Sequence, residues 1–165
     1  LTPDGRELWV AARAAGELVI VNTDKLEVTA RLPLPGIPIR IAITPDGRTA
    51  LVTCAGTAEV VAFDVATRSE RVRRRVDVPK APGADQRPLA RLAPDSVLPI
   101  GLLVSGDGAS AFVAATMGDV VVQFATGSLE PLRTIGVGGE PDGLAVTAVL
   151  PKAPCHACEP APDLN

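Results

Sequence analysis

The feature that most restricts the fold of this chain is an internal repeat of 42 residues. One five-residue turn occurs three times, with the third copy 61 residues after the second: Thr2–Arg6, Thr44–Arg48 and Ser105–Ala109. Three prolines mark the same two spacings in the opposite order: Pro38, Pro99 and Pro141. A fixed period of this length indicates a fold assembled from repeated supersecondary units. One insertion of 19 residues, at about 78–96, accounts for the longer spacing.

Each repeat predicts four short strands. Turns containing Pro, Asp and Gly separate runs of alternating apolar residues, as between antiparallel strands. The innermost runs are nearly continuously apolar, which predicts burial on both faces between radially stacked blades. We therefore predict an all-β fold, a β-propeller of four-stranded antiparallel blades, with about three blades present. From inner to outer strand, the predicted sets are 39–43, 100–104 and 142–146; 8–12, 50–54 and 111–115; 18–22, 60–64 and 121–125; and 27–32, 70–76 and 131–137.

The repeat frame predicts a partial propeller over residues 1–149. Its blades lie at about 1–35, 38–77 and 99–137, followed by a last inner strand at 141–149; 78–96 form a loop on the rim, and 150–165 a proline-rich, cysteine-containing tail. Known propellers have typically four to eight blades, so three cannot close a ring. The chain is either part of a longer propeller or a half-ring that pairs into six blades. Both alternatives expose apolar blade faces, which predicts self-association.

Three segments carry a resemblance to a known family: Pro141–Val146, Leu8–Ala11 and Val60–Val65. They resemble the YVTN-type β-propeller repeats of bacteria. The chain departs from that pattern in having no tyrosine, in Ala125 where an acidic residue is usual, and in Arg40 at a glycine position. The resemblance implies an extracytoplasmic location, periplasmic or secreted, and ligand sites on the rim that carries the inserted loop.

The composition and net charge of the chain exclude some classes of binding partner. With 47% apolar residues the chain has enough material for a packed core. A net charge of -3 argues against a nucleic-acid partner. No apolar run reaches the length of a membrane span, and no motif predicts a cofactor. The expected partner is a protein or a small molecule of unknown identity.

The candidate contact residues lie on one rim. Arg40 opens an innermost strand where the other blades have glycine, and its guanidinium is suited to a carboxylate or phosphate. Asp142 is either its ion-pair partner or a second ligand contact. The inserted loop adds five polar candidates: Lys80, Asp85, Gln86, Arg87 and Arg91. Its four prolines predict an extended, mostly non-helical loop, which either caps a ligand or is a solvated, tolerated insertion.

The cysteines divide into two groups. Cys54 aligns with Ala12 and Ala115, which predicts a buried, unreactive thiol. In the tail, Cys155, His156 and Cys158 are candidate ligands for a metal, and the other interpretations are a short-range disulfide or free thiols. The spacing does not fit haem attachment, because no histidine follows Cys158 directly.

The leading hypothesis for function is a non-catalytic binding or scaffolding propeller. The sequence has no Gly-x-Ser-x-Gly elbow, phosphate-binding loop or His-Glu-x-x-His motif, and its single histidine is His156. Two alternatives stay open: a hydrolase or lactonase-like propeller whose catalytic residues lie in blades outside this sequence, and a haem- or redox-associated propeller.

Overall fold

The structure, a computed structural model, describes residues 1–146 and contains three antiparallel sheets. Within that range there is no α-helix, and none of the helical turns could cross a membrane. The predicted all-β class is confirmed. The first sheet contains β1 (Glu7–Ala12), β2 (Glu17–Asn22) and β3 (Glu27–Pro33); the second β4 (Pro38–Ile43), β5 (Thr49–Cys54), β6 (Glu59–Asp64) and β7 (Ser69–Arg75); the third β8 (Pro99–Val104), β9 (Ser110–Ala115), β10 (Val120–Ala125) and β11 (Pro131–Gly136).

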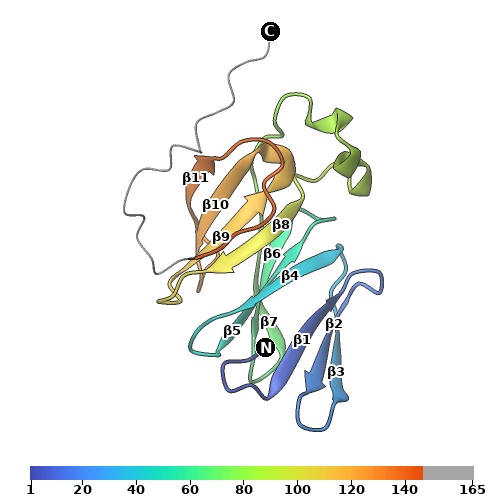
Figure 1. The fold of residues 1–165 in the computed structure, drawn as a ribbon, viewed down its shortest axis with the longest axis vertical. Helices are drawn as coiled ribbons and strands as arrows, with labels where there is room; N and C mark the ends of the chain where they lie inside the picture. Colours follow the sequence, from blue (N-terminus) through green and yellow to red (C-terminus); the bar gives the residue numbers. More distant parts are fainter. Residues whose placement is uncertain (147–165) are drawn as a thin grey trace.

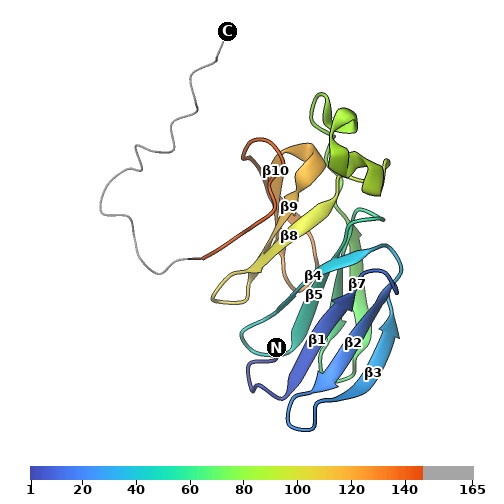
Figure 2. The same ribbon diagram turned by 45° about the vertical axis from the view of Figure 1, so that its right-hand side comes forward.

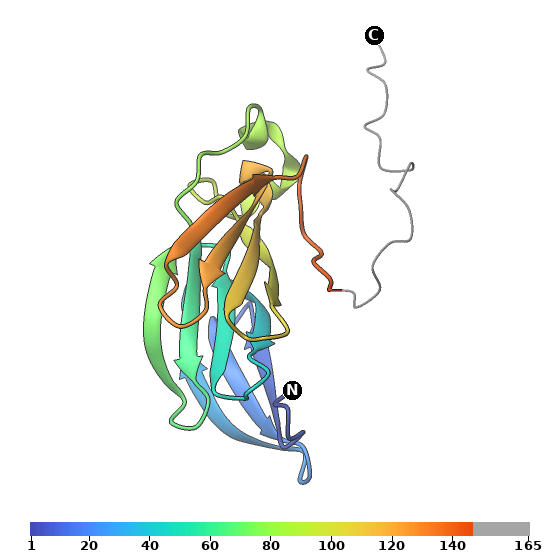
Figure 3. The same cartoon turned by 90° about the vertical axis from the view of Figure 1, so that its left-hand side faces the viewer.

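Consecutive sheets pack face to face as successive blades (Figure 1). Side chains of blades 1 and 2 form one core cluster, in which Trp9 lies edge-on to Phe63 with ring centroids 6.4 Å apart. Blades 2 and 3 form a second cluster that contains Leu51 and Phe124. Figure 3 shows the three sheets fanned out one behind the next. The middle blade is covered on both faces, which explains why β5 is buried along its whole length.

The first turn of each blade is closed by a hydroxyl group and a carboxylate. Thr44 Oγ1 donates to Asp46 Oδ1 at 2.5 Å, and the Arg48 amide donates to the same oxygen at 3.0 Å. The other two blades repeat this geometry with Thr2 and Asp4, and with Ser105 and Asp107. The hydrogen bond from the hydroxyl group has the larger effect and that from the backbone amide the smaller, and both lower the pKa of each of these carboxyls.

Within residues 1–146, inner strands are present in blades 2 and 3, and no strand of these residues occupies the inner position of blade 1. Sheet one has the order β1-β2-β3, whereas β4 and β8 complete sheets two and three. Figure 2 shows β1, β4 and β8 following one another from the first blade to the third. At the other end, Pro141–Val146 form no strand, in contrast to the predicted inner strand at 141–149. The physical reason is that no second strand among the described residues lies beside this segment to pair with it. Residues 147–149 are outside the described residues.

The insertion between β7 and β8 is folded onto the rim. It forms two 3₁₀ turns, η1 (Ala84–Gln86) and η2 (Pro88–Leu92), with Ala84 and Ala90 buried against Leu98 and Met117. The predicted extended, non-helical loop is therefore wrong for these turns. Pro88 lies in the first turn of η2, where a proline ring and its missing N–H are tolerated.

Cys54 is fully buried in the cluster between blades 1 and 2, as predicted. Burial raises the pKa of its thiol to about 12. We expect Cys54 to stay unmodified by a thiol reagent at pH 8 in a C155S/C158S background and to react stoichiometrically in urea, because only the thiolate is nucleophilic. The absorbance of the group that the reagent releases on reaction measures the fraction of modified thiol. Rapid reaction without urea would contradict the burial.

Candidate functional site

We call the rim that carries the insertion the insertion rim: residues 76–98, η3 (Thr116–Gly118) in the β9–β10 connection, and Asp119. The insertion is tied to η3 by backbone bonds, since the Ala81 amide donates to the Met117 carbonyl at 2.8 Å and the Met117 amide to that of Val97 at 2.9 Å. Ser96 Oγ also donates to the Ala55 carbonyl of blade 2, at 2.5 Å. The loop therefore bridges blades 2 and 3.

Arg87 holds the outer part of the insertion to blade 3. Its Nη1 and Nη2 donate to Asp119 Oδ1 and Oδ2 at 2.5 and 2.7 Å, a bidentate pair. The side chains are 21% and 24% exposed, so water screens this pair less than an open surface pair. The Arg87 bond, assisted by the Glu140 amide, lowers the pKa of Asp119 to about 2.

Of the other candidate residues in the insertion, Lys80 and Asp85 form a second ion pair, and the rest are exposed on the surface. Lys80 Nζ donates to Asp85 Oδ1 at 2.6 Å and to the Pro94 carbonyl. Arg91 lines a hollow of about 410 Å³ together with these two side chains. Gln86 is exposed on η1. Five residues that the sequence grouped only by proximity in the chain thus lie on one folded element, but only Lys80 and Asp85 contact each other through their side chains.

Arg40 and Asp142 lie together on the inner side of the blades. Arg40 Nη2 is 3.5 Å from Asp142 Oδ1, and both side chains are about half exposed. Of the two alternatives for Arg40, the structure shows the ion pair with an acidic neighbour. A ligand role for either residue stays a prediction.

Asp119 was missed by sequence reasoning. It occupies a left-handed backbone position, φ 55°, as do its repeat equivalents Gly16 (φ 63°) and Ala58 (φ 55°). Asp tolerates that conformation better than most residues. A charged residue at a repeated turn position on the rim was a signal that could have been used.

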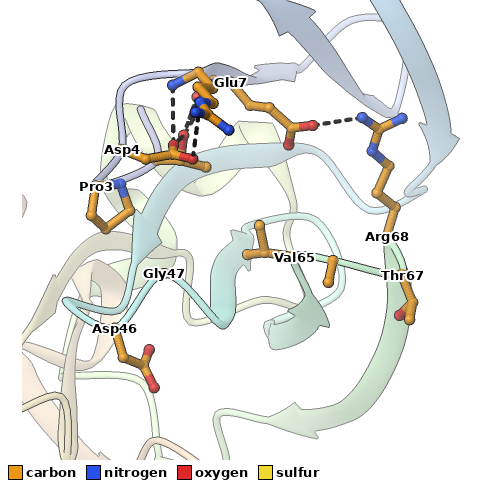
Figure 4. Close-up of a pocket in the computed structure, with 11 residues that line it drawn as sticks. Pro3, Asp4, Glu7, Asp46, Gly47, Val65, Thr67 and Arg68 are labelled. Carbon is orange, nitrogen blue, oxygen red and sulfur yellow. Dashed lines mark hydrogen bonds and ion pairs between the residues drawn. The ribbon is translucent and has the colours of Figure 1, made fainter.

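The opposite rim contains a second hollow that no sequence motif predicted. It has a volume of about 680 Å³ and lies between the first turns of blades 1 and 2 and the β6–β7 turn (Figure 4). Glu7 reaches across it to Arg68, with Oε1 2.6 Å from Nη2, and accepts a bond from Trp9 Nε1 at 3.0 Å. Asp4 and Asp46 also line this hollow, from the first turns of blades 1 and 2 respectively. Because Glu7 joins two blades, this pair supports the packing of blade 1 on blade 2.

Cys155, His156 and Cys158 lie outside the described residues. Within residues 1–146, no cluster of three or more His, Cys, Asp or Glu side chains is arranged to hold a metal ion.

No protein-family model matches this chain, and no curated protein sequence matches it. Solved structures match most of it. Hydrazine synthase of Kuenenia stuttgartiensis matches with a TM-score of 0.71 and 23% identity, over 87% of this chain and 36% of that one. The periplasmic gluconolactonase of Pseudomonas aeruginosa matches at 0.65 and 20%, over 86% and 40%; the WD40 repeats of RRP9 match at 0.66 and 10%, over 84% and 37%.

This chain has the β-propeller fold. It spans less than half the length of each of these three propellers, and identities this low show the fold alone. The matches include both a lactonase and WD40 repeats, and propellers host many unrelated functions. The similarity therefore does not choose between catalysis and binding.

The Arg87–Asp119 pair predicts an acid-sensitive insertion. Since the folded-state pKa of Asp119 lies below the ordinary carboxyl value, its stabilisation is complete above about pH 4 and is lost as the pH falls through about 2. We expect D119N to flatten the decrease in unfolding temperature between pH 4 and pH 2 relative to the parent. D95N, at an exposed insertion position, is the matched control. If the unfolding temperature of D119N fell between pH 4 and pH 2 as steeply as that of the parent, the Arg87–Asp119 pair would not contribute to stability.

Proposed function

We propose that this chain is a non-catalytic binding or scaffolding propeller whose contact surface is the insertion rim. The observation that carries the proposal is the folded state of the insertion. Ala84 and Ala90 are buried, the Ala81 amide donates to the Met117 carbonyl of η3, and Arg87 fixes the loop to Asp119. A loop fixed in this way offers a preorganised surface, which lowers the entropic cost of binding a partner.

The outer face of η2 supplies an apolar anchor for such a partner. Leu89 and Leu92 are 40% and 37% exposed. Residues three apart share one face of a 3₁₀-helix, so the two side chains lie together. Arg91 is exposed between them in the sequence and adds a planar cation. Exposed apolar groups with a polar surround are typical of protein contact sites.

The ion pairs of the rim also support a structural or binding role. Arg87, Lys80 and Arg40 each contact a carboxylate of the same chain. We extend the proposal to membership of the YVTN-type repeat family and to an extracytoplasmic location. The turn and strand motifs at Leu8–Ala11 and Pro141–Val146 support the first part. The second part rests on that family resemblance; one of the matching propellers is described as periplasmic.

Site-specific photo-crosslinking tests the contact surface. A photoreactive residue at position 89, used in an extract of the native cells, should give a few discrete products that disappear when L92D is added. The matched control is position 26, a leucine 81% exposed in the β2–β3 turn at the opposite rim. Equal products from both positions would refute the proposed surface. Turnover in an activity screen that R40A abolishes would refute the non-catalytic role.

A further inference from the structure

We propose that η3 and Asp119 couple the insertion to residues 140–142, so that a change on the inner side of the blades alters how firmly the contact surface on η2 is held. The coupling depends only on contacts among the described residues and is independent of the proposed function. Its consequence for a partner bound at Leu89 and Leu92 rests on that function.

The first connection is the carboxylate of Asp119, which accepts hydrogen bonds from both segments. Arg87 Nη1 of the insertion and the Glu140 backbone amide donate to the same oxygen, Oδ1, at 2.5 and 3.0 Å. Arg87 Nη2 holds the other oxygen at 2.7 Å, which fixes the rotation of the carboxylate. Because the bidentate bond orients the oxygen that the Glu140 amide needs, the bonds support one another.

The second connection is Thr116 of η3, which is 1% exposed. Its Oγ1 donates to the Pro141 carbonyl at 2.8 Å, and its carbonyl accepts a bond from Arg87 Nη1 at 3.4 Å. Its amide donates to the Leu98 carbonyl at 3.1 Å, at the end of the insertion rim. This buried residue therefore contacts the insertion with its backbone and the segment 140–142 with its side chain.

Arg87 also determines the position of the contact surface. It is the residue between η1 and η2, where its amide donates to the Ala84 carbonyl and its carbonyl accepts from the Ala90 amide, both at 3.1 Å. Leu89 and Leu92 belong to η2. The placement of both leucines thus depends on a residue that Asp119 holds.

Residues 140–142 extend the connection to the inner side of the blades. After β11 the chain passes η3 and then runs beside β8, as Figure 1 shows. Asp142 Oδ1 is 3.5 Å from Arg40 Nη2 on β4. An anionic ligand that displaces Asp142 from Arg40 would act on residues 140–142 and, through η3, on the insertion. By linkage, a partner that holds the insertion favours the Arg40–Asp142 pair by the same free energy.

Hydrogen exchange of single and double variants, measured by NMR on the whole chain, tests the coupling. R87Q removes the bidentate bond, and exchange at the Glu140 amide should accelerate about three- to tenfold. T116V removes the hydroxyl bond with little change in side-chain size, and exchange at Ala84 and Ala90 should accelerate about as much. The double variant should accelerate each of these amides by less than the product of the single effects, because both substitutions break one connection.

K80Q is the matched control. The Lys80 side chain bonds Asp85 and the Pro94 carbonyl, both within the insertion, so its removal should leave exchange at Glu140 unchanged. The amides of β5, which is buried along its whole length, report global unfolding. In every variant they should accelerate less than the Glu140, Ala84 and Ala90 amides.

Four results would each overturn the inference: unchanged exchange at Glu140 in R87Q, equal acceleration there in K80Q, acceleration of the β5 amides as large as that of Glu140, or fully multiplicative effects in the double variant. Exchange is measured without a partner. Its outcome is therefore separate from that of crosslinking at position 89, which tests the proposed function.

Discussion

Replacing Phe124 with alanine is expected to lower the free energy of unfolding by about 3–5 kcal/mol. Phe124 is 1% exposed and lies in the core cluster between blades 2 and 3. Its removal leaves a cavity in the interface that holds these blades together. Urea unfolding followed by circular dichroism measures the change.

Phe112 provides a matched control for this substitution in the same blade. It is half-buried on the opposite face, and neither of its Cα partners, Leu103 and Gln123, is fully buried. At submicromolar protein we expect F112A to cost about 1–2 kcal/mol, because fewer contacts are lost. Equal costs for F124A and F112A at high dilution would contradict the order of the blades.

The second large effect is expected from G101A. An added Cβ would lie 1.9 Å from the Asp142 carbonyl oxygen and 2.9 Å from the Ala114 side chain. Since β8 is held by β9, the 141–146 segment should move away and lose its contacts with Thr116 and Arg40. We expect hydrogen exchange at the Glu140 amide to accelerate on the order of tenfold, as one hydrogen bond is lost.

Gly106 is the matched control for G101A. A Cβ at that turn position would meet no atom within 4 Å. We therefore expect G106A to leave exchange at Glu140 unchanged. Exchange that accelerates equally in both variants would show that the effect is a general loss of stability rather than the displacement of 141–146.

The strands could be predicted because the repeat constrains them several times over. A single turn would have been ambiguous, but the shared spacing of Thr44–Arg48 with its two copies fixed one frame. The predicted and observed boundaries of β1–β11 differ by at most one residue at each end, as for β7 at Ser69–Arg75 against 70–76. In β2, where buried Leu18 and Ile20 alternate with less buried neighbours, the burial pattern follows from the pleat.

The insertion could not be predicted because it has no repeat copy. Its fold depends on Ala84 and Ala90 packing on Met117, which lies in another blade. Alanines carry no periodic signal, and the prolines favoured extended chain. Tertiary packing therefore decided the local structure, and with it the position of Arg87 opposite Asp119.

Only part of the candidate site could be predicted, namely the part that the repeat makes visible. Arg40 stood out because the repeat compares it with Gly101 and Gly143, and the structure places Asp142 beside it. The Glu7–Arg68 pair on the other rim joins residues 61 positions apart in different blades. A contact between blades of this kind leaves no trace in one sequence.

Hydrogen exchange of the intact protein, resolved over residues 80–92, tests most directly the central claim that the insertion is a folded part of the rim. The account predicts slow exchange at Ala81, Ala84, Arg87 and Ala90, whose amides donate to carbonyls at 2.8–3.1 Å. The Asp24 amide of the β2–β3 turn serves as the fast reference, because the neighbouring Thr23 and Lys25 amides are themselves hydrogen-bonded. Exchange of residues 80–92 as rapid as that of the Asp24 amide would contradict the account, because a mobile loop could not present Leu89 and Leu92 as a preformed contact surface.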